Sequence, residues 1–447
     1  MSVTEITRVD MLPLDGDRLL GFCVDSPVPD AGRDAYEFLC AGWVLGKTEP
    51  ALGVQLIGND GSVRRIPVGH PRPDVLRCHP GVADAAVAGW SSPVSVLGMN
   101  AEFELSVQAL LNNDPKPVPL ARIQGRRRPM RRSFEPGIQP LMVTSLGRTG
   151  STWLMRLLAE HPGILAHRAH PYEVCPMRNW MQFLGALTES APDAQSASKV
   201  AFPDAQWRVA YPLSNASALL APTMHGWYGR RFVEQAAEFF LRCGEDCYRE
   251  LATSQHQTAS VYFAEKHLPY EVPGIVWELY PNAREIFLVR DFRDMLCSIA
   301  AFNQKRGSAG FGRGFAASEE EYILNLAECV NWQGMAWNNR RDRACLVRYE
   351  DLVSRTAETL ATILNYLGLP ADDAEIDEMI RRAAVDTPDL EQHRTTPSLP
   401  ESVGRWRRDL PPELYAICQE AFGPGLADFG YTDFGYKAEG WARTIGQ

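Results

Sequence analysis

The stretch TSLGRTGSTWLMRLL, residues 144–158, places an arginine between two glycines and follows it with hydroxyl side chains. An apolar run precedes the stretch and an amphipathic pattern follows it, which indicates a strand-to-helix junction. The start of a helix offers backbone N–H groups and a positive dipole end, and together these bind anions. Gly147 and Gly150 allow the backbone to approach a phosphate closely, and Arg148 adds a planar cation. The predicted ligands of a nucleotide phosphate are Arg148, Thr149, Gly150, Ser151 and Thr152, and Thr149 and Ser151 could also cap the helix.

This loop differs from the Walker A motif of P-loop phosphotransferases. Walker A needs a lysine and a Ser or Thr directly after its second glycine, whereas Ser151 takes the lysine position here. A second glycine-lysine stretch, GWVLGKT at 42–48, has three residues between its glycines where four are needed. We therefore predict strand and turn for 42–48. A nucleotide or sugar kinase stays the rival enzyme class, although we find no acidic strand end suited to magnesium.

A second cationic motif lies in FLVRDFRDMLCSIAAF, residues 287–302. Arg290 ends a short apolar strand, and Ser298 follows eight residues later within a helical pattern. Arginine binds a phosphate with two parallel hydrogen bonds, and a serine near a helix start adds a hydroxyl. The structural alternative is an ion pair of Arg290 with Asp291 or Asp294. We predict that Arg290 and Ser298 bind a second phosphate.

Together the two motifs resemble those of sulfotransferases that use 3′-phosphoadenosine-5′-phosphosulfate (PAPS). GRTGSTW resembles the family's 5′-phosphosulfate-binding loop, and the Arg290–Ser298 pair resembles its 3′-phosphate motif. The cytosolic members carry a lysine in the loop; the protein-tyrosine and several bacterial members carry an arginine, as at Arg148. The resemblance implies an α/β fold, a P-loop-type parallel sheet flanked by helices. It also implies that PAPS is the donor, that PAP is the product, and that no metal is required.

Further segments extend this resemblance over roughly residues 139–435. FAEKHL (263–268) is similar to a family segment that supplies Lys266, although His267 stands where threonine is common. A lysine on a surface helix is the alternative for Lys266. LVRYEDLV and ESVGRWRRDL resemble the segments that bring a tyrosine and an arginine to the 3′-phosphate, here Tyr349 and Arg405. Trp153 resembles the aromatic residue that stacks on adenine, with a place in the helix core as the alternative.

The resemblance also implies catalytic roles. Arg148 and Lys266 would stabilise charge on the leaving phosphate during in-line transfer to a hydroxyl or amine. Glu173, in RAHPYEVCP, is the leading candidate for the base that takes the acceptor proton. His170 and His267 are its rivals, because the cytosolic members use a histidine.

The elements that must position these residues change in character along the chain. Residues 1–125 contain short β-rich runs separated by turn signals, which predicts a small sandwich-like all-β domain. It is weakly similar to β-rich accessory domains of some bacterial transferases. Residues 126–138 form a basic linker, which we expect to be solvated, with contact to an anionic partner as the alternative. Residues 139–447 form the sulfotransferase domain, where alternating strands and helices predict a parallel sheet.

Several segments of residues 139–447 carry this alternation. Strands are predicted in PLMVTSL, REIFLVR and ACLVRYEDLV, the last with a turn. Helices are predicted from Ser151 to Glu160, in DMLCSIAAFNQK, and in TAETLATILNYLGL ending at Gly368. Residues 171–251, rich in aromatics, are expected to shape the acceptor pocket.

Composition excludes several other classes. The formal charge of −10 over 447 residues argues against a general nucleic-acid binder. We expect neither a signal peptide nor a membrane span, and we interpret the ten cysteines as reduced thiols of a cytoplasmic protein. Cys243 with Cys247, and His167 with His170, could be parts of a metal site, but neither has partners at zinc-like spacing. The acceptor, whether small molecule, glycan or peptide, and the oligomeric state stay open, as does a non-catalytic nucleotide- or glycan-binding role.

Overall fold

The structure is a computed structural model that describes residues 2–59, 63–188, 226–269, 274–385 and 387–431. It divides into two compact units, which are described separately. The first unit holds residues 1–135, 179–243 and 272–281, and the second holds 136–178, 244–271 and 282–447. The first unit thus includes segments from beyond residue 139. The domain boundaries at 125 and 138 stay a prediction.

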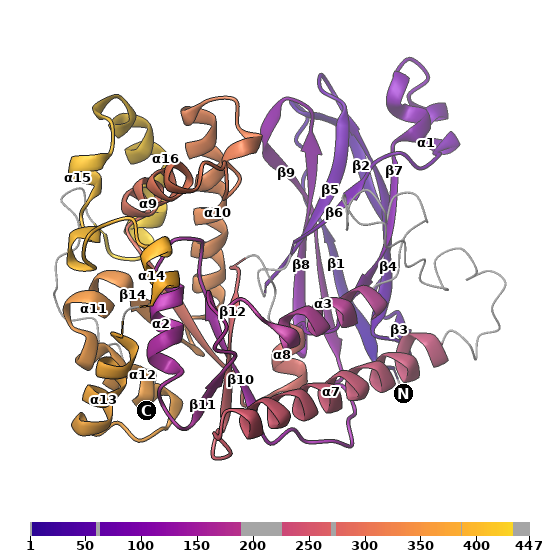
Figure 1. The fold of residues 1–447 in the computed structure, drawn as a ribbon. Coiled ribbons are helices and arrows are strands. Elements are labelled where there is room, and N and C mark those ends of the chain that lie inside the picture. The colour runs from indigo at the N-terminus through magenta and orange to yellow at the C-terminus, as the bar shows by residue number, and fades with distance from the viewer. Residues whose placement is uncertain (1, 60–62, 189–225, 270–273, 386, 432–447) are drawn as a thin grey trace. The chain divides into compact units, whose positions relative to one another are not determined.

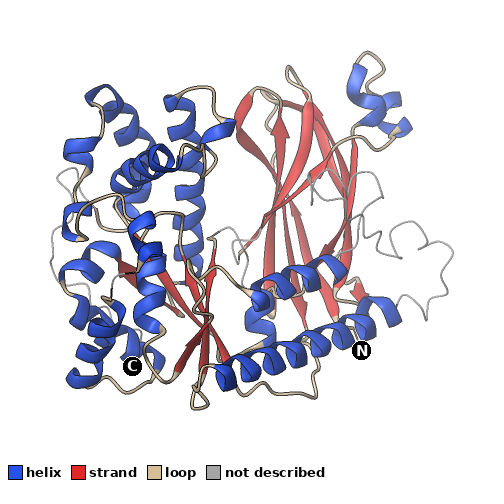
Figure 2. Ribbon diagram, in the orientation of Figure 1, coloured by secondary structure: helices blue, strands red, loops and turns tan. Residues whose placement is uncertain are grey.

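The first unit is built on two antiparallel sheets (Figure 2). One has the strand order β3-β1-β9-β8-β5-β6 and the other β2-β4-β7. Along β4 and β8 buried side chains alternate with more exposed ones, as expected when each sheet turns one face to a core. Phe38, Val107 and Leu120 lie in that core. The predicted sandwich-like all-β region is confirmed. The strands are β1 Thr4–Met11, β2 Leu19–Ser26, β3 Gly32–Arg33, β4 Glu37–Gly46, β5 Ala51–Gly58, β6 Val63–Pro67, β7 Gly89–Ser95, β8 Glu102–Leu111 and β9 Asp114–Arg127.

Residues 127–132 are bonded within the first unit. Arg127 pairs with Glu278, and both side chains are only 6% exposed. The backbone N–H of Met130 donates to the same carboxylate at 2.6 Å, and Arg132 donates to the carbonyl of Leu279. Arg127 is therefore held by an internal carboxylate, and the expectation of a fully solvated segment is wrong for this residue.

Short helices complete the first unit, and two longer helices contribute residues to both units. The short ones are α1 Pro73–Cys78, the 3₁₀ turn Ala83–Val87, the π-helical turn Trp227–Phe232 and α8 Gly274–Leu279. The longer ones are α3 Pro176–Thr188 and α7 Val233–Ser254. Residues 189–225, part of the segment expected to shape the acceptor pocket, lie outside the described residues.

The second unit contains a parallel sheet with the order β11-β12-β10-β13-β14. Its strands are largely buried apolar runs, as expected for a sheet covered on both faces. Because the strands are parallel, their carboxyl ends share one edge, where ligands bind in this architecture. The strands are β10 Gln139–Thr144, β11 Ile164–Ala166, β12 Tyr262–His267, β13 Arg284–Val289 and β14 Ala344–Arg348.

Two separate cores cover this sheet. Ile286 and Leu288 point into a core with residues of α2, α12 and α13. Val289, beyond Leu288 on the same strand, joins a core with α9, α10 and α16. The predicted sheet with helices on both faces is confirmed (Figure 1). The helices are α2 Ser151–Leu158, α9 Phe292–Arg306, α10 Glu319–Arg340, α11 Tyr349–Ser354, α12 Thr356–Leu367, α13 Asp373–Ala383, α14 Pro388–His393, α15 Trp406–Asp409 and α16 Tyr415–Asp428.

Local signals explain several helix limits. Asp291 caps α9 by accepting the N–H of Arg293, and Gly307 ends this helix with φ of 60°. Gly368 ends α12 in the same left-handed conformation, with φ of 68°, as predicted. The turn predicted within YEDLV is instead helix α11, which starts at Tyr349 directly after β14. This helix places Tyr349 at the carboxyl edge of the sheet.

Candidate active site

The loop between β10 and α2 is tightly shaped. Arg148 and Gly150 both adopt left-handed backbone conformations, with φ of 63° and 93°. A Cβ atom on Gly150 would lie 2.3 Å from the Tyr349 ring, and one on Gly147 would lie 2.6 Å from the Phe311 ring. Side chains at either glycine would therefore force the loop away from its neighbours. The glycines expected to bring the backbone close to a ligand also bring it close to Tyr349 and Phe311.

The hydroxyl residues of this loop have distinct roles. Thr149 is fully buried, and its hydroxyl donates to the carbonyl of Leu146 at 2.8 Å, so this side chain stabilises the loop itself. Gly150, without a side-chain cap, is the N-cap of α2, so the expectation that Thr149 or Ser151 caps this helix is wrong. Thr152 accepts a hydrogen bond from Lys266 at 3.0 Å. Ser151 is half-buried at the first position of the helix.

Arg148 reaches the second predicted motif. Its Nε donates to the hydroxyl of Ser298 at 3.3 Å, and another guanidinium nitrogen donates to the carbonyl of His393 at 2.9 Å. The guanidinium lies 4.3 Å from the centre of the Phe302 ring. Burial, followed by the positive charge of Arg290, lowers the pKa of Arg148 to about 10. An anion placed here would relieve this crowding of positive charge.

Arg290 completes the link between the motifs. It is 4% exposed, donates to the backbone carbonyl of Arg148 at 3.1 Å and to that of Ser402 at 2.6 Å. The guanidinium lies 4.5 Å from the centre of the Tyr349 ring, and the Tyr349 hydroxyl lies 2.9 Å from the Ser402 hydroxyl. The Nε atom of Arg290 is buried and has no hydrogen-bond partner within the described ranges. The alternative partner Asp291 is bound by Arg293, at 2.7 and 2.9 Å.

Arg405 joins the same cluster from the C-terminal part of the chain. It donates to the Thr395 hydroxyl at 2.8 Å and to Asp409 at 2.7 Å. The Thr395 hydroxyl also lies 3.4 Å from that of Ser298. The structure therefore brings Arg148, Arg290, Ser298, Tyr349 and Arg405 together, as the two-motif hypothesis requires.

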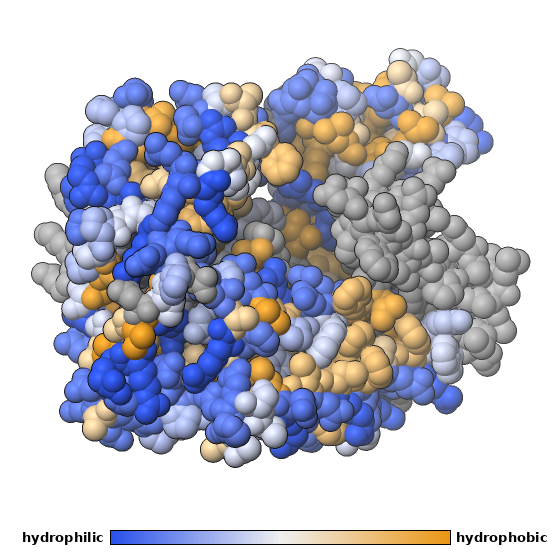
Figure 3. All heavy atoms as spheres, in the orientation of Figure 1, coloured by the Kyte–Doolittle hydropathy of each residue, from blue (hydrophilic) through white to orange (hydrophobic). Residues whose placement is uncertain are grey.

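One chain segment, residues 387–403, supplies half of the oxygen atoms to which Arg148, Arg290 and Arg405 donate hydrogen bonds. Sequence reasoning missed this contribution, which comes from His393, Thr395 and Ser402. The run HRTTPS at 393–398 carries a weak signal, because its hydroxyls directly precede the 401–410 motif. Hydrophilic residues gather in the region of α14 (Figure 3). Apart from the ion pair of Arg405 with Asp409, the cations contact neutral carbonyl and hydroxyl oxygens, and phosphate oxygens in these places would form stronger, charge-assisted bonds.

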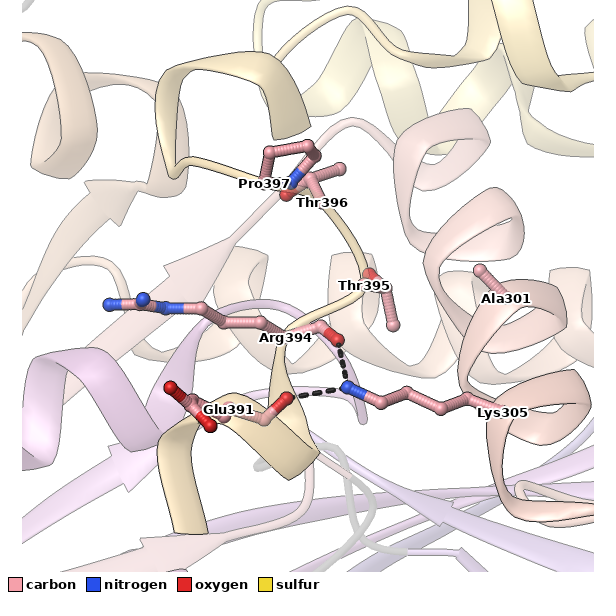
Figure 4. A pocket seen from close by; sticks show the side chains of 7 residues that line it. All are labelled: Ala301, Lys305, Glu391, Arg394, Thr395, Thr396 and Pro397. Atoms are coloured by element: carbon pink, nitrogen blue, oxygen red, sulfur yellow. Dashed lines mark hydrogen bonds between the residues drawn. The ribbon is translucent and has the colours of Figure 1, made fainter. Parts of the chain in front are cut away.

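A hollow of about 420 Å³ lies beside this segment. Figure 4 shows Lys305 reaching from α9, with its Nζ donating to the carbonyls of Glu391 and Arg394 at 2.5 and 3.0 Å. These bonds hold the end of α14 against α9. Thr395 borders both the hollow and the arginine cluster. The lining residues are Ala301, Lys305, Glu391, Arg394, Thr395, Thr396 and Pro397.

Lys266 and Glu173 lie on the other side of the loop. Lys266 belongs to the buried strand β12, so the alternative of a surface-helix lysine is wrong. Its Nζ donates to the carbonyl of Pro171 at 2.6 Å and lies 3.6 Å from Glu173. Burial lowers the pKa of Lys266, and the charge of Glu173 opposes this shift. The Glu173 side chain is 66% exposed, so it is accessible to an incoming molecule.

The two rival histidines differ in environment. His267 is buried at the end of β12, and burial together with nearby arginines lowers its pKa to about 3. A side chain so enclosed is poorly placed to meet an acceptor. The Nε2 of His170 lies 3.4 Å from the Nδ1 of His393, a residue that sequence reasoning missed. Burial and the charge of Arg148 lower the pKa of His393 to about 4, so this imidazole is neutral at pH 7.

Trp153 is only partly buried and packs against the core of α2, α12 and α13. Its Nε1 is buried without a hydrogen-bond partner in the part of the chain that the structure describes. The core contact is therefore real, and stacking on adenine stays a prediction.

Among the described residues, no group of three or more His, Cys, Asp or Glu side chains could hold a metal ion. Cys243 and Cys247 lie on α7 as half-buried thiols. No helix in the described ranges is long and apolar enough to cross a membrane.

The second unit is an α/β protein with a cationic cluster at the carboxyl edge of its parallel sheet, the edge where ligands bind in this architecture. The profile described as "Sulfotransferase family" matches residues 140–373, more than half of the chain. The chain therefore belongs to the sulfotransferase family.

Individual relatives are more distant. The chain is 29% identical to mouse carbohydrate sulfotransferase 3 over 163 residues, and the match spans 34% of each protein, about a third of that relative's length. The sulfotransferase domain of the Synechococcus PCC 7002 olefin synthase is 21% identical, with a TM-score of 0.36 over 68% of this chain and 99% of that one. Sulfotransferase STF9 from Mycobacterium avium is 14% identical, with a TM-score of 0.34 over 68% of this chain and 79% of that one.

Proposed function

We propose that the protein transfers a sulfuryl group from PAPS to an acceptor hydroxyl or amine and releases PAP. The observation that carries this proposal is the junction of two motifs far apart in sequence. Arg290 donates to the carbonyl of Arg148 at 3.1 Å, and Arg148 donates to Ser298 at 3.3 Å. One nucleotide with phosphates at both ends can engage such a cluster. Membership of the sulfotransferase family supports the same reaction.

The site residues divide between the two phosphates in this proposal. The backbone of residues 148–152 and the hydroxyls of Ser151 and Thr152 hold the 5′-phosphosulfate, and Trp153 offers a ring to the adenine. The 3′-phosphate is bound by Arg290, Ser298, Tyr349 and Arg405. Their polar groups now contact oxygen atoms of Thr395 and Ser402. Phosphate oxygens would replace neutral acceptors with charged ones, which strengthens each bond.

The transfer itself needs little covalent chemistry from the protein. The bond between sulfur and the bridging phosphate oxygen breaks while a bond forms between sulfur and the acceptor oxygen or nitrogen. Arg148 and Lys266 stabilise the negative charge that develops on the leaving phosphate. Glu173 takes the acceptor proton. Its exposed carboxylate lies 3.6 Å from Lys266, the residue that stabilises the leaving oxygen. His170 is the alternative base.

The test is release of PAP from PAPS in the presence of a panel of phenols, sugars and tyrosine peptides. Arg148→Ala should slow release by about 10³-fold, and Arg381→Ala should leave it unchanged, because Arg381 is an exposed helix residue bonded to Glu378. Parallel reactions with ATP and magnesium measure kinase activity. Phosphoryl transfer from ATP would refute the proposal in favour of a kinase, and tight PAP binding without turnover on any acceptor would favour a binding protein.

A further inference from the structure

Asp294 is a fully buried carboxylate on α9, one turn before Ser298. Its Oδ2 accepts the backbone N–H of Gly404 at 2.6 Å, and its Oδ1 accepts that of Trp406 at 2.8 Å. These two amides belong to the residues on either side of Arg405. One carboxylate therefore binds the backbone both before and after the arginine that we place at the 3′-phosphate.

The local geometry is suited to this attachment. Gly404 has a left-handed φ of 68°, and a Cβ there would lie 2.8 Å from a guanidinium nitrogen of Arg407. The Trp406 ring lies 4.1 Å from the guanidinium carbon of Arg293, also on α9. Asp294 and Arg293 thus hold residues 404–406 against the same helix that carries Ser298. Loss of the acceptor would leave two amide groups without their partner, which is costly inside a protein.

A buried carboxylate beside the proposed 3′-phosphate site is electrostatically unfavourable in two ways. Burial raises the pKa of Asp294 to about 6; Arg290 and the two amides act in the opposite direction, and Asp291 adds to the increase. A negative charge near a phosphate site also repels the ligand. A group with these two disadvantages is best explained by the geometry that it imposes on its neighbours.

We propose that Asp294 is a positioning residue that fixes Arg405 in place for the 3′-phosphate. This inference rests on the proposed function. Asp294 acts through the backbone of 404–406, and the nucleotide itself contacts Arg405. The consequence is a specific pattern, in which loss of Asp294 weakens nucleotide binding and leaves the chemical step nearly intact.

The experiment is calorimetric titration of PAP into full-length variants, followed by kinetics with PAPS. Asp294→Asn keeps the shape but turns an NH₂ group toward one of the two amides. We expect the Kd for PAP and the KM for PAPS to rise about 10- to 100-fold, as for other residues that orient a ligand-binding group, with kcat changed less than about threefold. In the Arg405→Ala background the same substitution should have almost no further effect, because Asp294 acts through Arg405.

The matched control is Asp372→Asn. Asp372 caps α13 by accepting the N–H of Glu375 at 2.8 Å, the same kind of bond in a different helix. The Asp372→Asn substitution should leave PAP affinity unchanged. If Asp294→Asn does not fold, Gly404→Ala tests the same attachment from the other side, and it should weaken PAP binding similarly.

The outcomes separate this inference from the proposed function. Wild-type protein that fails to bind PAP would refute both. Wild-type protein that binds PAP, with unchanged affinity in Asp294→Asn or with fully additive losses in the double variant, would overturn the positioning role alone. Hydrogen exchange of the Gly404 and Trp406 amides without nucleotide adds a direct measurement, since exchange must accelerate in Asp294→Asn.

Discussion

The two halves of the candidate site, one proposed for the donor and one proposed for the acceptor, are built differently. In the donor half, Arg148, Arg290 and Arg405 are largely buried and each makes several bonds. In the acceptor half, the Glu173 side chain is 66% exposed and its ion pair with Lys266 measures 3.6 Å. A donor with fixed phosphates can be matched by preorganised cations, which need no rearrangement when charge develops. Under the proposed function, this contrast means that the fold specifies the donor more strictly than the acceptor.

Lys266 lies between the two halves. Its Nζ bonds Thr152 of the donor loop and the carbonyl of Pro171, and Glu173 follows two residues after Pro171. A carboxylate of the same strand, Glu265, accepts the N–H groups of Met177 and Arg178 at 2.9 and 2.8 Å. Strand β12 thus anchors the segment that carries the proposed base. In the acceptor half, the Glu173 side chain is exposed, whereas the backbone shortly after it is held by hydrogen bonds to Glu265.

The largest expected effect comes from the donor half. Arg148→Ala should lower kcat for PAP release by about 10³-fold, or roughly 4 kcal/mol in the barrier, because a single cation aimed at the transferring group contributes on this scale. Arg148→Lys should retain part of the rate. Steady-state kinetics at saturating PAPS measures both, and a loss under tenfold in the alanine variant would remove Arg148 from the chemical step.

A buried acid beneath the donor half should make stability depend on pH. Glu350 accepts the N–H of Asp291 and the hydroxyl of Tyr431, and burial raises its pKa to about 7 from an ordinary 4.5. The fold therefore favours the protonated form. Its stabilising contribution is complete below pH 4.5 and is lost as pH rises through about 7, by up to about 3 kcal/mol.

Chemical denaturation between pH 4.5 and 8 measures this effect. Glu350→Gln should flatten the dependence, since it cannot ionise. An unchanged pH profile in this variant would assign the dependence to other groups.

The acceptor half should respond in kcat with little change in PAP binding. Glu173→Gln should lower kcat on a poorly acidic alcohol by about 10²-fold, or roughly 2.7 kcal/mol, as loss of a general base does. On an acidic phenol the loss should be smaller, because the phenol needs less help to release its proton. His170→Asn is the matched variant for the rival base. A near-normal rate for Glu173→Gln, with a large loss for His170→Asn, would transfer the role to the histidine.

Loss of a cation at the other end of the nucleotide should weaken binding more than turnover. Arg290→Ala should raise the Kd for PAP about 30-fold, or roughly 2 kcal/mol, the scale of hydrogen bonds to a charged group. Calorimetric titration measures it, with Arg381→Ala as the exposed control. An equal loss of affinity for PAP and for adenosine 5′-phosphosulfate, which lacks the 3′-phosphate, would place Arg290 elsewhere on the nucleotide.

Sequence reasoning located much of the second unit because its signals are local. The glycines around Arg148 and the eight-residue spacing from Arg290 to Ser298 specify a loop and a strand-to-helix junction without reference to distant residues. Strand β1 and the proline-containing β9 carry weaker sequence signals, because charges and prolines obscure their alternation. Glu173 was identified only through resemblance, since nothing in its neighbourhood shows that it approaches Lys266.

The sequence by itself determined the parallel α/β architecture, the anion-binding loop and the arginine-serine motif, because each depends on backbone conformation over a few consecutive residues. Only the tertiary structure decided which distant groups meet. The order β12-β10-β13 places the loop after β10 between Lys266 and Arg290, and α9 brings Asp294 to the backbone around Arg405. Such contacts join segments more than a hundred residues apart. They depend on how buried surfaces pack, which spacing along the chain does not encode.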